Sequence, residues 1–238
     1  MPAIGKRTRN LREQVDRDRN YQPAEAIALV RDTATAKFDE TVELHLRTGL
    51  DGRHADQQLR GSVLMPHGLG RTIRVAVFAE GEAATLATEA GADIVGGDEL
   101  IESVARGAMD FDVALAQREL MGKIGRLGRV LGPRGKMPNP RSNTVLETAD
   151  IARAVGEARA GRVEFRLDRT NLIHCPIGKV SFSQDDLLGN MFTLVDEIAK
   201  ARPSGAKGQY IRGATLASTM GPGVAVDVAS MLTMAAQT

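Results

Sequence analysis

The feature that most constrains the fold is a change of pattern along the chain. From about residue 73 to residue 160, short apolar strand-like runs alternate with helix-like segments. Such alternation predicts a small parallel sheet whose strands are joined by crossover helices. The predicted strands are 73–78, 94–95 and 113–116, and the predicted helices are 81–90, 98–106 and 150–159.

The segments on both sides of this block follow a different pattern. Residues 38–46 alternate, with Val42, Leu44 and Leu46 on one side and polar residues on the other, which is typical of a strand with one buried face. Pro23 begins a helical pattern. After Gly161 we expect a helix at 184–201 and strands at 163–167, 172–173, 180–182, 210–217 and 224–228.

The two patterns together predict an α/β protein of two domains. An α+β outer domain is formed by residues 1–68 and 161–238, and a Rossmann-like α/β domain, residues 69–160, is inserted into it. Two strand-to-strand crossings, near Gly68 and Gly161, join the two domains.

Composition restricts the class of protein. The 238 residues include one cysteine, Cys175, so an internal disulfide is impossible and a reducing cytoplasm is the simplest expectation. No run of about 18 apolar residues is present, so we expect no membrane span. The first residues also lack an apolar core of signal-peptide length.

Charge is distributed unevenly around a formal net charge of +1. Residues 75–119 carry two basic and ten acidic side chains. Residues 121–141 have no acidic side chain and six basic ones, Lys123, Arg126, Arg129, Arg134, Lys136 and Arg141. Residues 122–143, which are rich in Gly, Pro and Arg, are predicted to form a long basic loop. Basic blocks of this kind can contact a polyanion, although unevenly charged solvated surface explains any single block about as well.

Enzyme motifs are missing from the sequence. Gly135-Lys136 is not part of a phosphate-binding P-loop, because Val130 replaces the required first glycine and Met137 the required hydroxyl. No dinucleotide fingerprint follows residues 73–78, and the four histidines are scattered. We therefore expect neither an enzyme nor a metal or cofactor.

Three polar stretches at predicted strand ends are the features of the sequence that indicate a binding surface. They are residues 37–43, residues 168–174 with 178–182, and residues 218–222. Their hydroxyls, carboxylates and glycines suit contact with 2′-hydroxyls, base amines and phosphates of folded RNA. Turns and caps explain the first two stretches about as well, and Met220 could simply fill the core.

The first and third of these stretches belong to a series of short sequence motifs that occur in a fixed order along the chain. They are AKFDETVE at 36–43, RHADQQLRG at 53–61, LMPHG at 64–68, GAD with VGG at 91–97, LGPRGKMPNP at 131–140, GAKG at 205–208 and TMGP at 219–222. From about Leu11 to Asp227 the chain resembles the bacterial ribosomal protein L-one family, the mobile stalk protein near the ribosomal exit site.

The resemblance implies two domains joined by a two-strand hinge, and a non-enzymatic protein that is a monomer when free. It implies a cytoplasmic, ribosome-associated protein whose partners are the 23S ribosomal RNA stalk, its own messenger RNA, whose translation it represses, and transfer RNA leaving the exit site.

Carried over by position, the resemblance implies particular RNA-binding residues. The main site comprises Phe38, Thr41, Glu43, Thr219, Met220 and Gly221. Secondary candidates are Lys37, Asp168, Thr170, His174, Lys179 and Ser181. The basic stretch adds Arg126, Arg129 and Arg134, which we expect to make long-range contacts with phosphate.

Two positions depart from the family pattern. Ser218 stands where we expect threonine, and Asn171 where many relatives have a turn glycine. Asparagine tolerates left-handed geometry, so we expect the turn to survive. Two alternatives remain: a non-ribosomal repressor that binds structured RNA, and a nucleotide-dependent enzyme on the inserted sheet. Sedimentation with ribosomes in high salt would distinguish a ribosomal protein from the non-ribosomal repressor.

Overall fold

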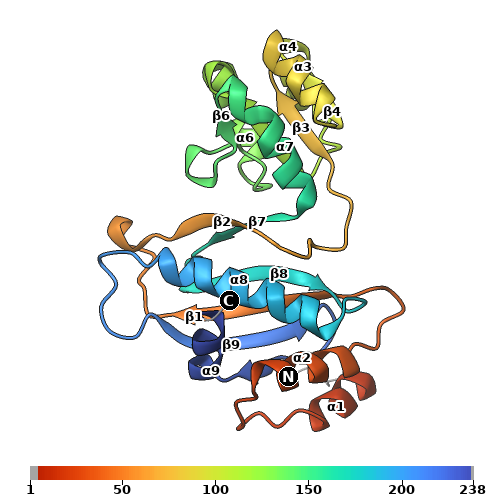
Figure 1. Cartoon of the computed structure of the whole chain (residues 1–238), viewed down its shortest axis with the longest axis vertical. Helices are drawn as coiled ribbons and strands as arrows, with labels where there is room; N and C mark the ends of the chain where they lie inside the picture. Colours follow the sequence, from red (N-terminus) through yellow and green to blue (C-terminus); the bar gives the residue numbers. More distant parts are fainter. Residues whose placement is uncertain (1–4, 237–238) are drawn as a thin grey trace. The chain divides into compact units, whose positions relative to one another are not determined.

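The computed structural model describes residues 5–236, except for the side chain of Arg141. The chain divides into two compact units, which are considered separately (Figure 1). The outer unit is Met1–Gly70 with Val163–Thr238, and the inserted unit is Arg71–Arg162. The boundaries expected from the sequence lie within two residues of these; independent folding of each unit stays a prediction.

The outer unit is built around a four-stranded antiparallel sheet in the order β10-β9-β1-β8. Its central strand β1 pairs with β8 on one side and β9 on the other. The strands are β1 (Thr41–Thr48), β8 (Leu172–Lys179), β9 (Ile211–Ser218) and β10 (Val224–Val226).

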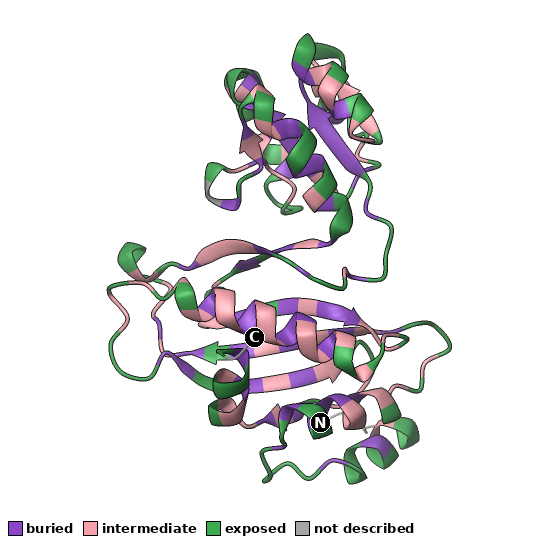
Figure 2. Cartoon of the chain, in the orientation of Figure 1, coloured by how far each residue is buried: buried purple, intermediate pink, exposed green. Residues whose placement is uncertain are grey.

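Burial alternates along these strands, as the sequence predicted for β1. Val42, Leu44 and Leu46 are buried, whereas the residues between them are partly exposed (Figure 2). The buried side of the sheet packs on helices, and the other side presents its side chains to solvent. The helices of this unit are α1 (Lys6–Glu13), α2 (Pro23–Asp32), α8 (Gln184–Lys200) and α9 (Val228–Ala235).

The prediction of a strand at 180–182 was wrong. β8 instead continues from Leu172 through Pro176 to Lys179. Proline lacks the N–H needed in a sheet interior, but β8 is an edge strand, where this loss is tolerated. A β-bulge between Val42 and Glu43 accommodates Gly178, whose φ of 154° few side chains adopt.

The prediction of a strand through residue 228 was also wrong. β10 ends at Val226, and Asp227 then begins α9 by accepting hydrogen bonds from the Ser230 N–H and hydroxyl. Apolar residues at Met231 and Ala235 face the core. The cap residue followed by helical spacing was a readable start signal.

A two-stranded sheet is formed by segments that precede and follow the inserted unit in the sequence. It pairs β2 (Arg60–Leu64) with β7 (Arg162–Arg166). Arg60 and Glu164 form an ion pair of 3.1 Å across it. A Cβ at Gly61 would lie 2.5 Å from the Phe165 ring, so this strand needs glycine there.

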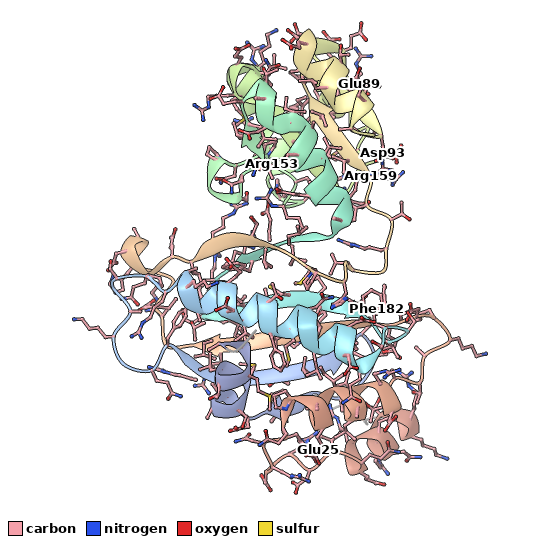
Figure 3. All side chains as sticks on the ribbon, viewed as in Figure 1. Glu25, Glu89, Asp93, Arg153, Arg159 and Phe182 are labelled. Carbon is pink, nitrogen blue, oxygen red and sulfur yellow. The ribbon has the colours of Figure 1, made fainter. Side chains whose placement is uncertain are left out.

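The inserted unit contains the predicted parallel sheet, in the order β4-β3-β5-β6. The strands are β3 (Val75–Phe78), β4 (Ile94–Gly96), β5 (Val113–Gln117) and β6 (Val145–Leu146). The crossover helices are α3 (Glu82–Glu89) and α4 (Asp98–Ala105), and α7 (Ile151–Ala160) follows the last strand. Arg159 of α7 forms an ion pair of 3.9 Å with Asp93 (Figure 3).

The basic stretch is not the long irregular loop that the sequence predicted. It forms α5 (Met121–Ile124) and α6 (Gly128–Leu131), separated by a 3-10 turn, η3 (Gly125–Leu127). Ile124, Leu127 and Leu131 pack into the core at helical spacing, and the glycines between them concealed this pattern. The remaining 3-10 turns are η1 (Ala55–Gln57), η2 (Arg118–Leu120), η4 (Pro140–Ser142) and η5 (Thr148–Asp150).

Candidate nucleic-acid interface

The polar stretches at the two ends of the sequence meet around one buried carboxylate. Glu40, which is 1% exposed, accepts hydrogen bonds from the Ala36 N–H at 2.9 Å, the Ser218 hydroxyl at 2.8 Å and the Met220 N–H at 2.8 Å. Burial alone would raise the pKa of Glu40, but these hydrogen bonds and the charge of Arg7 hold it below its ordinary value. The carboxylate therefore fixes loop 36–40 against loop 218–221.

A second set of contacts joins the same loops through Thr41 and Thr219. The Thr219 N–H donates to the Thr41 carbonyl at 3.1 Å, and the Thr219 hydroxyl accepts from the Thr41 N–H at 3.0 Å. Thr219 is exposed, yet its hydroxyl is largely occupied within the protein. A substitution at Thr219 would therefore change the loop and its binding capacity together.

Two large apolar side chains project from the joined loops. Phe38 is 55% exposed and Met220 is 49% exposed. The alternative in which Met220 fills the core is therefore wrong. Gly221 follows directly, and a Cβ there would come within 2.4 Å of the Ser218 hydroxyl, so the tight turn needs glycine. An exposed aromatic ring and an exposed thioether on two joined loops suit contact with bases or riboses.

Two of the secondary candidates are part of the same cluster. Lys179 donates to the Thr41 hydroxyl at 2.9 Å and to the Asp39 carbonyl at 3.3 Å. Ser181 donates both its N–H and its hydroxyl to the Asp39 carboxylate. Lys37 is exposed on the same loop as Phe38. These contacts hold the loop in place and put positive charge beside the exposed apolar pair.

The other candidates lie along the solvent side of the sheet. On β1, Glu43 follows Thr41 on that side, and His45 comes next and stands opposite His174 of β8. The two imidazoles approach to 2.7 Å between their Nδ1 atoms. Asp168 and Thr170 lie in the turn before β8, at the far end of the sheet face. At about 3.3 Å per residue, the candidates span roughly 20 Å.

Burial, hydrogen bonds and neighbouring charges shift the pKa values of two side chains on this side of the sheet. Burial, and then the neighbouring His174, lower the pKa of His45, while Glu43 opposes the shift. Burial would raise the pKa of Asp168, but hydrogen bonds from Thr170 and Leu172 lower it. Asn171 has the left-handed φ of 65° that its turn requires, as expected for a residue in place of glycine.

The charges of the basic stretch are not equivalent. Lys123 pairs with Asp98, and Lys136 donates to the Phe111 carbonyl, so both contribute to the fold of the inserted unit. Arg134 contacts the Met109 sulfur at 3.5 Å. Arg126 and Arg129 are exposed, and neither forms an ion pair within the described part of the chain. These two arginines are the best placed to reach an external phosphate.

The structure offers little support for other site chemistry. Within residues 5–236, no group of three or more His, Cys, Asp or Glu side chains is arranged to hold a metal ion. Burial raises the pKa of Cys175 to about 12, which suits a packed thiol and not a nucleophile. None of the described helices is long and apolar enough to cross a bilayer.

Sequence reasoning missed the residues that organise the interface. Glu40 has no local signal that distinguishes it from the other polar residues of 37–43. Its partners are Ala36 close by, and Ser218 and Met220 about 180 positions away. The pairing of His45 with His174 likewise depends on strand register. Alternation along 41–48 correctly places His45 on the same side as Glu43, but it does not reveal which residue of β8 stands opposite.

Comparison with known proteins agrees with this geometry. The model of the ribosomal protein L1p/L10e family matches residues 30–222. The chain is 55% identical to large ribosomal subunit protein uL1 of Chloroflexus aggregans, over 97% of this chain and 98% of the relative. It is 53% identical to the uL1 protein of Dehalococcoides mccartyi strain 195, over 98% of this chain and 99% of the relative.

These relatives are structural proteins of the ribosome and not enzymes. Identity above one half extends over nearly the whole of both chains. The chain belongs to the ribosomal protein L1p/L10e family.

Proposed function

We propose that this chain is a component of the large ribosomal subunit whose outer unit binds the stalk of 23S ribosomal RNA. The proposed contacts are made by loops 36–40 and 218–221 and by the solvent side of the sheet from Glu43 to Thr170. A further part of the proposal is that the protein assists release of transfer RNA from the exit site and represses its own messenger RNA through the same outer surface.

The observation that carries the proposal is the joining of two distant loops through Glu40. Hydrogen bonds fix both backbones, and the fixed loops present Phe38 and Met220 to solvent. A rigid surface loses little conformational entropy when it binds. Apolar contact beside hydroxyls, carboxylates and a lysine suits unstacked bases and riboses, so it favours folded RNA over an arbitrary polyanion.

Glu43 contributes to the proposed selectivity. Its carboxylate is partly exposed on the sheet face and lies 3.8 Å from His45. A negative group would repel phosphate, but it can accept hydrogen bonds from base amines or 2′-hydroxyls. RNA that places such donors over the sheet would therefore bind in preference to RNA that places phosphate there.

The inserted unit has a different proposed role. Arg126 and Arg129 are exposed and available for contacts with phosphate, which strengthen binding without reading sequence. We assign these contacts to transfer RNA or to neighbouring ribosomal RNA. Recognition of the isolated stalk belongs to the outer unit alone.

The division of roles predicts the behaviour of the separated units. A polypeptide in which residues 1–70 are joined by a short linker to residues 163–238 should fold and bind a stalk fragment within about threefold of the full chain. Residues 71–162 alone should not bind it specifically. Titration of a labelled fragment against both polypeptides, with circular dichroism to confirm folding, measures this.

A folded outer polypeptide that has lost most of its stalk affinity would contradict the proposed location of the site. Equal affinity for the stalk fragment and for a scrambled hairpin of the same length would contradict stalk recognition itself. The scrambled hairpin therefore serves as the control in each titration.

A further inference from the structure

A pocket lies beside the loop that carries Met220. Its volume is about 330 Å³, and it is lined by residues from two parts of the sequence that lie about 200 positions apart. One wall is formed by α1 and the residues that follow it, including Thr8, Arg12 and Arg17. Another part of the lining is formed by Thr215 of β9 and by Gly221 and Gly223 of the last loop.

α1 and the residues that follow it carry apolar side chains that are buried in the outer unit. Leu11 and Val15 are buried, and Tyr21, also buried, forms an isolated parallel bridge with Val226 of β10. The Tyr21 hydroxyl accepts a hydrogen bond from the Asp16 N–H at 2.9 Å. The segment is therefore a fixed part of the outer unit and not a free tail.

Positive charge on this segment lies near the loops of the candidate RNA surface. Residues 5–17 contain five basic side chains and two acidic ones. Arg7 is close enough to Glu40 for their charges to interact. Arg12 and Arg17 are exposed at the pocket, and neither forms an ion pair with another described residue.

We propose that this pocket is a subsite for one nucleotide of the bound RNA, in which Arg12 and Arg17 hold the backbone phosphate and the wall of Gly221 and Gly223 admits its ribose. The inference rests on the proposed function, because the same RNA must occupy loop 218–221 and the pocket. Guanidinium groups donate paired hydrogen bonds to phosphate oxygens. Glycines allow the sugar to approach the backbone closely.

Other features of the pocket fit a sugar and phosphate. The hydroxyls of Thr8 and Thr215 have no hydrogen-bond partner within residues 5–236, so both can pair with a 2′-hydroxyl or a phosphate oxygen. Val15 and Ala225 supply apolar surface to the same lining. Asp16 also lines the pocket, but its carboxylate already accepts a hydrogen bond from the Asp18 N–H at 3.0 Å.

The test measures affinity of the full chain for a transcribed stalk fragment of the 23S ribosomal RNA over a series of salt concentrations. Arg12→Gln and Arg17→Gln should each weaken binding by about tenfold, as loss of a charged hydrogen bond does. Each should also reduce the salt slope by about one, because one phosphate contact is lost. Ala225→Leu, which fills the pocket and changes no charge, should weaken binding by a similar factor.

Arg9→Gln is the matched control. Arg9 is exposed on α1 and does not line the pocket, so its replacement should change affinity by less than about twofold. Melting temperatures of all variants show that each is folded.

Equal effects of Arg9→Gln and Arg12→Gln would overturn the inference, because charge would then act only at long range. Unchanged affinity of folded Ala225→Leu would overturn it as well. If the unmodified chain does not prefer the stalk fragment over a scrambled hairpin, the proposed function itself fails, and the subsite fails with it.

Discussion

Glu40→Gln is expected to destabilise the outer unit by roughly 2–4 kcal/mol and to abolish most of its stalk affinity. The carboxylate accepts from three donors, and glutamine replaces one of its two acceptor oxygens with an NH2 group, which donates and does not accept. Each buried donor left without an acceptor costs about 1–3 kcal/mol. Loops 36–40 and 218–221 would then separate, and Phe38 and Met220 would lose their fixed positions.

The effect of Glu40 should depend on pH in a defined direction. Its folded pKa lies below the ordinary value of 4.5, so the stability that the carboxylate contributes is fully present above that value. It is lost as the pH falls through the lower, folded pKa. Urea unfolding at neutral pH and well below pH 4.5 should therefore show a difference between wild type and Glu40→Gln that shrinks in acid.

Glu25→Gln provides the matched control for this substitution. Glu25 is exposed and forms one ion pair of 2.8 Å with Arg19. Exposed ion pairs contribute about 0–1 kcal/mol, so this variant should keep both stability and RNA affinity. If Glu40→Gln resembled Glu25→Gln in both measurements, the buried carboxylate would not organise the interface.

Removal of the exposed apolar pair should produce the second large effect. Met220→Ala and Phe38→Ala should each weaken binding to the stalk fragment by roughly 10-fold, and the double variant by roughly 100-fold, because complete burial of such a side chain contributes about 1.5–3 kcal/mol. The melting temperature should change little, since both side chains are about half exposed in the free protein. Filter binding and calorimetry measure the two quantities.

Two further variants separate this surface from other parts of the molecule. Leu64→Ala removes an apolar side chain of similar exposure, 45%, from β2, and it should leave fragment affinity unchanged.

The double variant Arg126→Ser, Arg129→Ser should keep its affinity for the isolated stalk fragment but bind ribosomes more weakly at low salt. A loss from Leu64→Ala as large as that from Met220→Ala would show that apolar exposure alone explains the effect. A large fragment defect in the arginine variant would move the primary site to the inserted unit.

Much of the fold could be predicted because local pattern and tertiary environment agree. The alternation along 41–48 fits a half-buried strand, and Pro23 begins α2 where its missing N–H costs nothing. The alternation of strands and helices between residues 73 and 160 gave the parallel sheet. In these segments, the spacing of apolar residues along the sequence identifies both the type of element and its buried side.

The failures occurred where tertiary context overrode local signals. Pro176 and Gly178 suggested a break, but an edge strand with a bulge tolerates both. The glycines among residues 122–128 concealed helical spacing, so the basic stretch was read as a loop. The importance of Glu40 could not be predicted locally, because two of its three partners lie at the other end of the sequence.

The most direct test of the central claim is to identify the RNA that the full chain contacts in cells. Ultraviolet crosslinking followed by sequencing of the attached RNA should give one dominant peak on the 23S stalk. Crosslinked peptides should come from loops 36–40 and 218–221, and the Glu40→Gln variant should lose the peak. Reads dispersed over many RNAs, or a stalk peak attached only to peptides of residues 71–162, would contradict the account.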